Sequence, residues 1–170
     1  MSESLAVGRA QTRPAGPASH AAGTAGIAAL DTRRKLQLAL GVIWVLDGIL
    51  QFQPSMFTKS FPDMLAESAH GNPGVVAGPI TWSASLIDHH VVVLNALFAT
   101  IQLALGLGIA WRPTLRLALA ASIAWSLAVW WLGEGLGGIL AGTASPVNGA
   151  PGPVLLYAIL AVLLWPADRD

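Results

Sequence analysis

Four long apolar segments alternate with polar segments along the chain, at about residues 36–53, 91–111, 115–134 and 150–166. A helix needs about 20 mostly apolar residues to cross the hydrocarbon core of a bilayer, with a range of about 17–25. All four segments fall in that range, the last only because it is extended back from Val154 to Ala150. The pattern therefore predicts an all-α integral membrane protein, built as a four-helix bundle.

The polar segments predict the remaining organisation. Residues 1–33 are rich in Ala, Gly, Ser, Thr and Pro without an apolar period, which predicts a disordered tail. Residues 34–167 then form the four-span membrane domain. The connection at 54–90 is too long for a simple hairpin and is interrupted by four prolines. We expect it to form a cap over one end of the bundle, with short amphipathic interfacial helices at 55–69 and 75–87.

Each of the first three apolar segments gathers its small and polar residues on one helical face, at steps of three and four residues. These sets are Gln37, Gly41, Trp44, Gly48 and Gln51; Asn95, Ala99, Gln102 and Gly106; and Ser122, Ser126, Trp130 and Glu134. We expect these faces to point into the bundle. Asp47 lies beside the first face, about 18 Å along the helix from Lys35 at about 1.5 Å per residue.

Composition supports a membrane protein and excludes several functions. The chain is 54% hydrophobic and only 11% charged, against about 25% charged in soluble proteins. Nine basic and nine acidic residues cancel, so nothing indicates nucleic acid. The absence of cysteine excludes disulfides, a thiol relay and cysteine-held iron–sulfur or zinc sites. Redox chemistry would need a bound cofactor or a partner, and no nucleotide-binding, nucleophile or kinase motif is present.

The distribution of Lys and Arg predicts the orientation. Five of the nine precede residue 36, two lie at Arg112 and Arg116, and one is Arg169, whereas the long connection holds only Lys59. Because cytoplasmic segments carry the excess of cations, we expect a multi-pass protein of the cell membrane with both termini in the cytoplasm. The connection at 54–90 then lies outside.

Polar residues at the outer ends of the helices form the candidate ligand-binding site: Asp47, Gln51, Asn95, Trp130 and Glu134. Carboxylates and indoles at this depth would suit a quinone, a lipid headgroup or another small polar ligand. In the alternative interpretation, these groups bond to one another and hold the helices in register, at about 0.6 kcal/mol each. No residue is predicted to be catalytic, and whether the chain is an enzyme stays open.

His89 and His90 are weak candidates for a zinc or copper site at the outer mouth, together with Asp88, His70 and Glu134. Adjacent helical side chains point about 100° apart, so the two imidazoles do not easily share one metal. We therefore favour histidines that cap the second span.

The second span, with Gln102, Gly106 and Gly108 followed by Arg112 and a new Ala- and Leu-rich span, resembles the DoxX-like family of four-helix bacterial membrane proteins. Residues 34–48 resemble the first helix of that family, with Gln51 where a lysine is frequent. The resemblance implies a bacterial inner-membrane bundle, acting as an accessory or redox-associated subunit beside a membrane oxidoreductase partner. A small proton-coupled or metal transporter using Asp47 and Glu134, and a scaffold without ligand, are the alternatives.

Overall fold

The computed structural model describes the backbone of residues 17–166 and the side chains of residues 31–166. Its α-helices are α1 (Pro17–Leu50), α2 (Ser60–Glu67), α3 (Gly74–His89), α4 (Val91–Ala110), α5 (Leu115–Leu132) and α6 (Pro153–Leu163). Short 3₁₀ turns are η1 (Pro54–Phe57), η2 (Arg112–Thr114), η3 (Gly135–Gly138) and η4 (Pro146–Asn148). No strand occurs in these residues, so the all-α prediction is confirmed.

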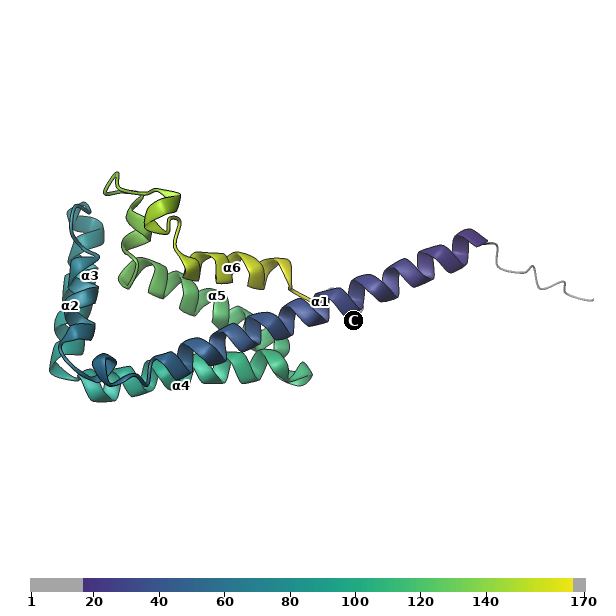
Figure 1. The fold of residues 1–170 in the computed structure, drawn as a ribbon, viewed down its shortest axis with the longest axis horizontal. Helices are drawn as coiled ribbons and strands as arrows, with labels where there is room; N and C mark the ends of the chain where they lie inside the picture. Colours follow the sequence, from purple (N-terminus) through teal and green to yellow (C-terminus); the bar gives the residue numbers. More distant parts are fainter. Residues whose placement is uncertain (1–16, 167–170) are drawn as a thin grey trace, which may run out of the picture. The chain divides into compact units, whose positions relative to one another are not determined.

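The chain divides into two compact units, Met1–Arg34 and Lys35–Asp170. The second unit contains α2 to α6 and the second part of α1, and it is called the bundle below. In the bundle, the long helices α1, α4, α5 and α6 run along one direction, and α2 and α3 stand across one end (Figure 1). The predicted cap at 54–90 thus corresponds to η1, α2 and α3.

Three helix ends differ from the predicted segments. α1 ends at Leu50 rather than 53, because Pro54 disfavours helical backbone just before it. α5 ends at Leu132 rather than 134, where Gly133 is followed by left-handed backbone from Gly135 to Gly138. α6 begins at Pro153 rather than Ala150, since Gly152 has a φ of 107° that a helix does not allow.

Residues 17–33, which belong to the predicted tail at 1–33, are helical and form the first part of α1. Several alanines precede Arg33, and alanine has the highest intrinsic helix propensity. An amphipathic period is therefore not required for a helix here. The predicted disorder of residues 1–16 lies outside the described residues.

Glycines bring α1 and α4 into backbone contact. A Cβ added at Gly106 would lie 2.5 Å from the Gly41 carbonyl oxygen and 2.6 Å from Val45 Cγ2. About two turns further along α1, a Cβ added at Gly48 would lie 2.8 Å from Leu103 Cγ. Small residues at such a contact let two apolar helices approach closely and gain van der Waals energy. The predicted small-residue faces of the first two spans therefore pack against each other.

The bundle core lies among α1, α4, α5 and α6. Its buried residues are Leu40, Trp44, Leu105, Ile109, Leu115, Ala118, Leu119, Ala161 and Leu164. At the capped end, Phe61 and Leu65 of α2 pack with Ala84 and Ile87 of α3, and Phe98 of α4 packs against them. The cap is therefore joined to the bundle by apolar contacts of its own.

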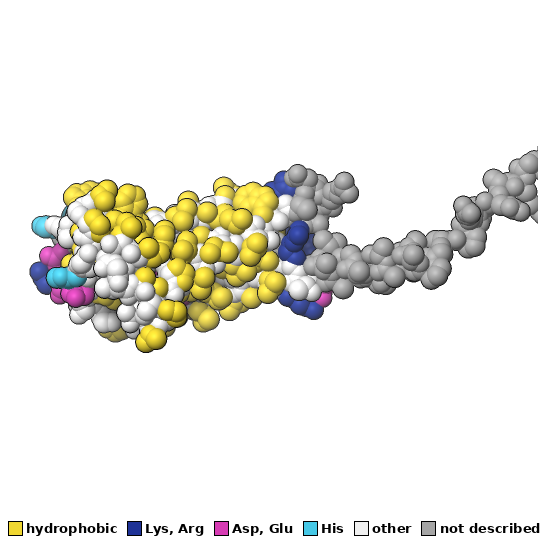
Figure 2. All heavy atoms as spheres, turned by 90° about the horizontal axis from the view of Figure 1, so that it is seen from above, with side chains coloured by type: hydrophobic (Ala, Val, Ile, Leu, Met, Phe, Trp, Pro, Cys, Tyr) yellow, Lys and Arg dark blue, Asp and Glu magenta, His cyan; other side chains and the backbone are white. Residues whose placement is uncertain are grey.

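Apolar side chains also cover the outside of the bundle. Val93, Leu117 and Leu163, on three different helices, are each 70–73% exposed. On the face shown in Figure 2, apolar side chains occupy the middle, Lys and Arg gather at one end, and Asp, Glu and His gather at the other. α4 and the segment Arg112–Leu132 are each long and apolar enough to cross a membrane. Exposed apolar area on this scale is typical of a lipid-facing surface.

Gly106→Ala should destabilise the bundle by about 1–3 kcal/mol, because the added methyl overlaps backbone atoms of α1 that cannot rotate away. Gly78→Ala in α3 is the matched control, since its Cβ meets nothing within 4 Å and the change favours a helix. Thermal unfolding of the purified protein in detergent measures both. Equal stability of the two variants would contradict the close α1–α4 contact.

Candidate functional site

A buried polar network joins α1, α5 and α6 below the cap. The Trp44 indole donates to Ser122 Oγ at 2.8 Å, and its ring meets that of Tyr157 edge-on with centroids 5.2 Å apart. The Tyr157 hydroxyl is near enough to the Asp47 carboxylate, one turn along α1 from Trp44, to donate a hydrogen bond to it. Tyr157 is the only tyrosine in the chain.

Gln51 and Asn95 join α1 to α4 at the capped end. Gln51 Nε2 donates to Asn95 Oδ1 at 2.6 Å, and Asn95 Nδ2 donates to the Gln51 carbonyl oxygen at 2.9 Å. Asn95 is fully buried, so both ends of its amide are satisfied inside the protein. This pair registers the two helices, as the alternative interpretation of the sequence expected.

Trp130 and Glu134 hold the non-helical segment that leads into α6. Trp130 Nε1 donates to the Pro151 carbonyl oxygen at 2.6 Å, and Glu134 Oε1 accepts from the Val154 backbone N–H at 3.3 Å. Val154 lies in the first turn of α6, where backbone N–H groups have no partner in the helix. A carboxylate there also interacts favourably with the helix dipole. Both side chains thus have a structural role.

Glu134 lies beyond the end of α5 and is half-buried, close to Gly152. A Cβ on Gly152 would overlap Glu134 Oε2, so only glycine lets the carboxylate lie against this backbone. Burial raises the pKa of Glu134, and the bond from Val154 N–H opposes that shift in part. The protonated form is therefore more favoured here than in water.

The turn that follows Glu134 has unusual backbone. Gly135, Leu136, Gly137 and Gly138 all have positive φ values, between 55° and 71°. Leucine in this conformation costs about 1–2 kcal/mol. The Leu136 side chain offsets that cost by packing against a buried cluster of Ala69, Val76 and Ile80 from the cap. The turn therefore connects α5 to the cap and sets the position of Glu134.

Three cavities surround these residues, and the first is called the aromatic cavity. It has a volume of about 320 Å³ and lies among η1, the cap helices, α4 and α5. Its lining is Gln51, Met56, Phe61, Met64, Leu65, Ser83, Ile87, Phe98, Gln102, Trp125, Ala128, Val129, Leu132, Gly133 and Glu134. Apolar walls with a few polar groups are typical of small-molecule sites.

The second, the tyrosine cavity, has a volume of about 260 Å³ and contains the Asp47–Tyr157 pair. It is lined by Trp44, Asp47, Leu50, Gln51, Gln102, Trp125, Val129, Pro153, Val154 and Tyr157. Gln51, Gln102, Trp125 and Val129 line both this cavity and the aromatic cavity. The two cavities are therefore neighbours.

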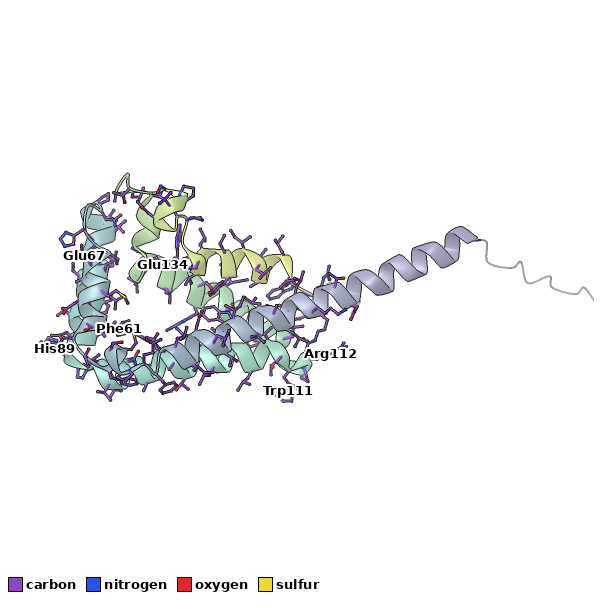
Figure 3. All side chains as sticks on the ribbon, in the orientation of Figure 1. Phe61, Glu67, His89, Trp111, Arg112 and Glu134 are labelled. Atoms are coloured by element: carbon purple, nitrogen blue, oxygen red, sulfur yellow. The ribbon has the colours of Figure 1, made fainter. Side chains whose placement is uncertain are left out.

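The third, the outer cavity, has a volume of about 380 Å³ and lies between the end of α2 and the loops on either side of η4. Its lining is Glu67, Ser68, His70, Asn72, Glu134, Gly137, Gly138, Ala141, Thr143, Asn148, Gly149, Gly152 and Pro153. In Figure 3, Glu67 and Glu134 both lie toward this end of the bundle, and Arg112 lies at the opposite end. Glu134 lines both the outer cavity and the aromatic cavity.

Several buried polar atoms near these cavities have no hydrogen-bond partner among the described residues: Gln102 Oε1, Trp125 Nε1, Ser126 Oγ, Glu134 Oε2 and Asn72 Oδ1. A buried donor or acceptor without a partner costs about 1–3 kcal/mol. Four of these five residues line at least one cavity, Ser126 being the exception. The unpaired atoms thus gather where a bound molecule would meet them.

The five residues of the predicted ligand site are brought to one end of the bundle, but only some reach a cavity. Asp47, Gln51 and Glu134 line cavities, whereas Asn95 and Trp130 line none of the three and serve helix pairing and the α6 approach. Both carboxylates are near enough to act electrostatically on the Tyr157 hydroxyl.

The predicted histidines are exposed at the junction of α3 and α4. His89 Nδ1 lies 2.7 Å from the Ser85 carbonyl oxygen of its own helix, and His90 is the cap residue between the two helices. Among the described residues, no group of three or more His, Cys, Asp and Glu side chains is placed to hold a metal ion.

Tyr157, Trp125 and Asn72 were not predicted as site residues. Tyr157 lies on a short apolar helix whose face has no polar period. The one signal for Tyr157 is that a single tyrosine occurs in an apolar segment, where a buried hydroxyl requires a partner.

Tyr157→Phe and Asp47→Ala should each destabilise the bundle by about 0.5–1.5 kcal/mol, since the first removes the donor and the second the acceptor of the same hydrogen bond. The double variant should lose less than the sum of the two losses. Unfolding in detergent measures this cycle. Thr100→Val, which removes an exposed hydroxyl bonded to its own helix, is the control and should add to Asp47→Ala. Strictly additive losses for the tyrosine pair would show that the bond is absent.

Comparisons with protein-family models, with characterised proteins and with solved structures found no match for this chain.

Proposed function

We propose that the bundle is a multi-pass membrane domain in which α1, α4, α5 and α6 cross the bilayer and both termini lie in the cytoplasm. The exposed apolar side chains of these helices support it, since they would face lipid. Arg112 lies in the turn between α4 and α5, at the end opposite the cap, and Arg116 lies in the first turn of α5. Because cytoplasmic loops carry an excess of Lys and Arg, these arginines favour a cytoplasmic position for that end of the bundle.

α6 has only 11 residues, about 17 Å at about 1.5 Å per residue, which is less than the bilayer core. The C-terminal end of α6 lies beside Gln37 of α1, since Gln37 Nε2 donates to the Leu164 carbonyl oxygen at 2.9 Å. The segment before Pro153 would therefore enter below the outer surface of the bilayer. Non-helical backbone at that depth needs partners within the protein, and Trp130 and Glu134 supply them.

Within this domain, the aromatic cavity would bind a small amphipathic ligand such as a quinone or a lipid. The observation that carries this proposal is the pair of unpartnered atoms, Gln102 Oε1 and Trp125 Nε1, at a cavity with Phe61 and Phe98 in its walls. A ligand with a polar head and a flat or flexible apolar body would pair with those atoms and fill the remaining volume. The rings of Phe98 and Trp125, 5.5 Å apart, would contact the apolar part.

The role that suits such a domain is an accessory or redox-associated subunit of a membrane oxidoreductase. This part of the proposal is supported by the resemblance of the first two spans to DoxX-like proteins. It is compatible with a chain that has no cysteine and in which the carboxylates near the cavities already serve structural bonds. A bound ligand or a partner would then supply the redox chemistry.

The topology predicts that a fluorescent reporter fused to the C-terminus is active in the cytoplasm, and that a periplasmic phosphatase reporter at that position is inactive. A phosphatase reporter inserted at Gly71, in the turn between α2 and α3, should show the reverse pattern because it lies in the outer cap. Phosphatase activity at the C-terminus would overturn the four-span arrangement.

The ligand proposal predicts that the purified protein carries a quinone or lipid that mass spectrometry detects after mild detergent extraction. Val129→Phe should lower its occupancy about tenfold or more, because the larger side chain would occupy space shared by the aromatic and tyrosine cavities. Leu127→Phe is the control, since it adds the same ring on an exposed position of the same helix. Absence of a ligand from the wild type, or equal occupancy in both variants, would contradict the proposal.

A further inference from the structure

The buried side-chain atoms without a partner at the outer cavity are acceptors. Three of its side-chain donors bond to carbonyl oxygens: Ser68 Oγ donates to that of Leu65, Asn72 Nδ2 to that of Ser68, and Asn148 Nδ2 to that of Thr143. The bond from Asn72 Nδ2 also fixes which end of that amide is the oxygen. Asn72 Oδ1 and Glu134 Oε2 are buried and have no partner in the described part of the chain.

The two unpaired acceptors belong to one place in the fold. Both residues line the outer cavity, and both lie against the same left-handed turn. A Cβ on Gly135 would lie 3.0 Å from Asn72 Nδ2, and Gly135 directly follows Glu134 in the chain. The absence of a side chain at Gly135 therefore allows the end of α2 to approach the turn that carries the carboxylate.

We propose that the outer cavity is a binding site for the ammonium group of a primary amine, held by Glu134 Oε2 and Asn72 Oδ1. An ammonium group has three N–H donors and no acceptor, so it complements a site whose two buried unpaired side-chain atoms are both acceptors. Bonds from an ammonium to a carboxylate are about twice as strong as bonds between neutral groups.

Charge favours a cation over an anion at this position. Glu67 and Glu134 line the cavity, and none of its lining residues is Lys or Arg. The one imidazole there, that of His70, lies 3.5 Å from the Glu67 carboxylate. A bound cation would also stabilise the ionised form of Glu134 against the cost of burial.

The place of the cavity indicates two sources for such an amine. It lies at the capped end of the bundle, which in the proposed topology is at the level of the outer lipid headgroups. The ammonium group could belong to an aminophospholipid in the bilayer or to a soluble amine outside the cell. Both sources present the same donors to Glu134 and Asn72.

The ammonium site goes beyond the proposed ligand of the aromatic cavity and uses different atoms. Gln102 and Trp125 carry the first proposal, whereas Glu134 Oε2 and Asn72 Oδ1 carry this one. Val129→Phe should therefore leave amine binding unchanged, since Val129 does not line the outer cavity. Failure of one proposal is then distinguishable from failure of the other.

The experiment uses the full chain and measures thermal stability in two settings. In detergent, ethanolamine is titrated against tetramethylammonium, which carries the charge but no N–H donor. In nanodiscs, phosphatidylethanolamine is compared with phosphatidylcholine and phosphatidylglycerol. Stabilisation by ethanolamine but not tetramethylammonium would assign a soluble amine, and stabilisation by phosphatidylethanolamine alone would assign the lipid. Equal responses to all of these compounds, or none, would overturn the proposal.

Glu134→Gln should weaken the amine response about tenfold or more, because it removes the charge while keeping an acceptor for Val154 N–H. Asn72→Ala, which removes the second acceptor in a surface turn, should weaken it as well and tests the site if Glu134→Gln does not fold. Asp63→Asn is the matched control, since that carboxylate is exposed on α2, does not line the outer cavity and should retain the response when neutralised. An unchanged response in both Glu134→Gln and Asn72→Ala would also overturn the proposal.

Discussion

Polar groups placed between apolar helices lose water, so each needs a partner inside the protein, and this requirement organises the bundle. Trp44 meets it with Ser122, Gln51 with Asn95, and Asp47 with Tyr157. Each of these bonds joins two different helices. Because the helices are mostly apolar, such bonds and the α1–α4 glycine contact favour one arrangement of the helices over others.

The same requirement explains the end of the bundle beneath the cap. The chain enters α6 through non-helical backbone, which leaves the Pro151 carbonyl and the Val154 N–H without helical partners. Trp130 near the end of α5 and Glu134 just beyond it bond to these two groups. Glu134 thus has one carboxylate oxygen bonded and the other without a partner, and the residue lines two cavities.

The unpaired polar atoms at the aromatic cavity and at the outer cavity differ in their hydrogen-bonding chemistry. Around the aromatic cavity, an indole donor and an amide acceptor lie among rings and aliphatic side chains, which suits an amphipathic molecule. In the outer cavity, the buried unpaired side-chain atoms are acceptors, which suits a donor such as an ammonium group. The cap helices α2 and α3 contribute to the walls of the aromatic cavity, and α2 with the loop after it contributes to the outer one, so the cap lines both cavities.

Much of the fold could be predicted from the order of the residues, because helical periodicity depends on local spacing alone. That spacing placed α4 and α5 within one or two residues, and it put Gly41, Gly106, Ser122 and Ser126 on inward faces. It also brought Asp47 and Glu134 to the same end. Tertiary structure alone decided that Asn95 and Trp130 form structural bonds, and that Tyr157 and Asn72 line cavities. Partners 20 to 110 residues apart in the chain become neighbours only through packing, and the local spacing of residues carries no information about which of them will meet.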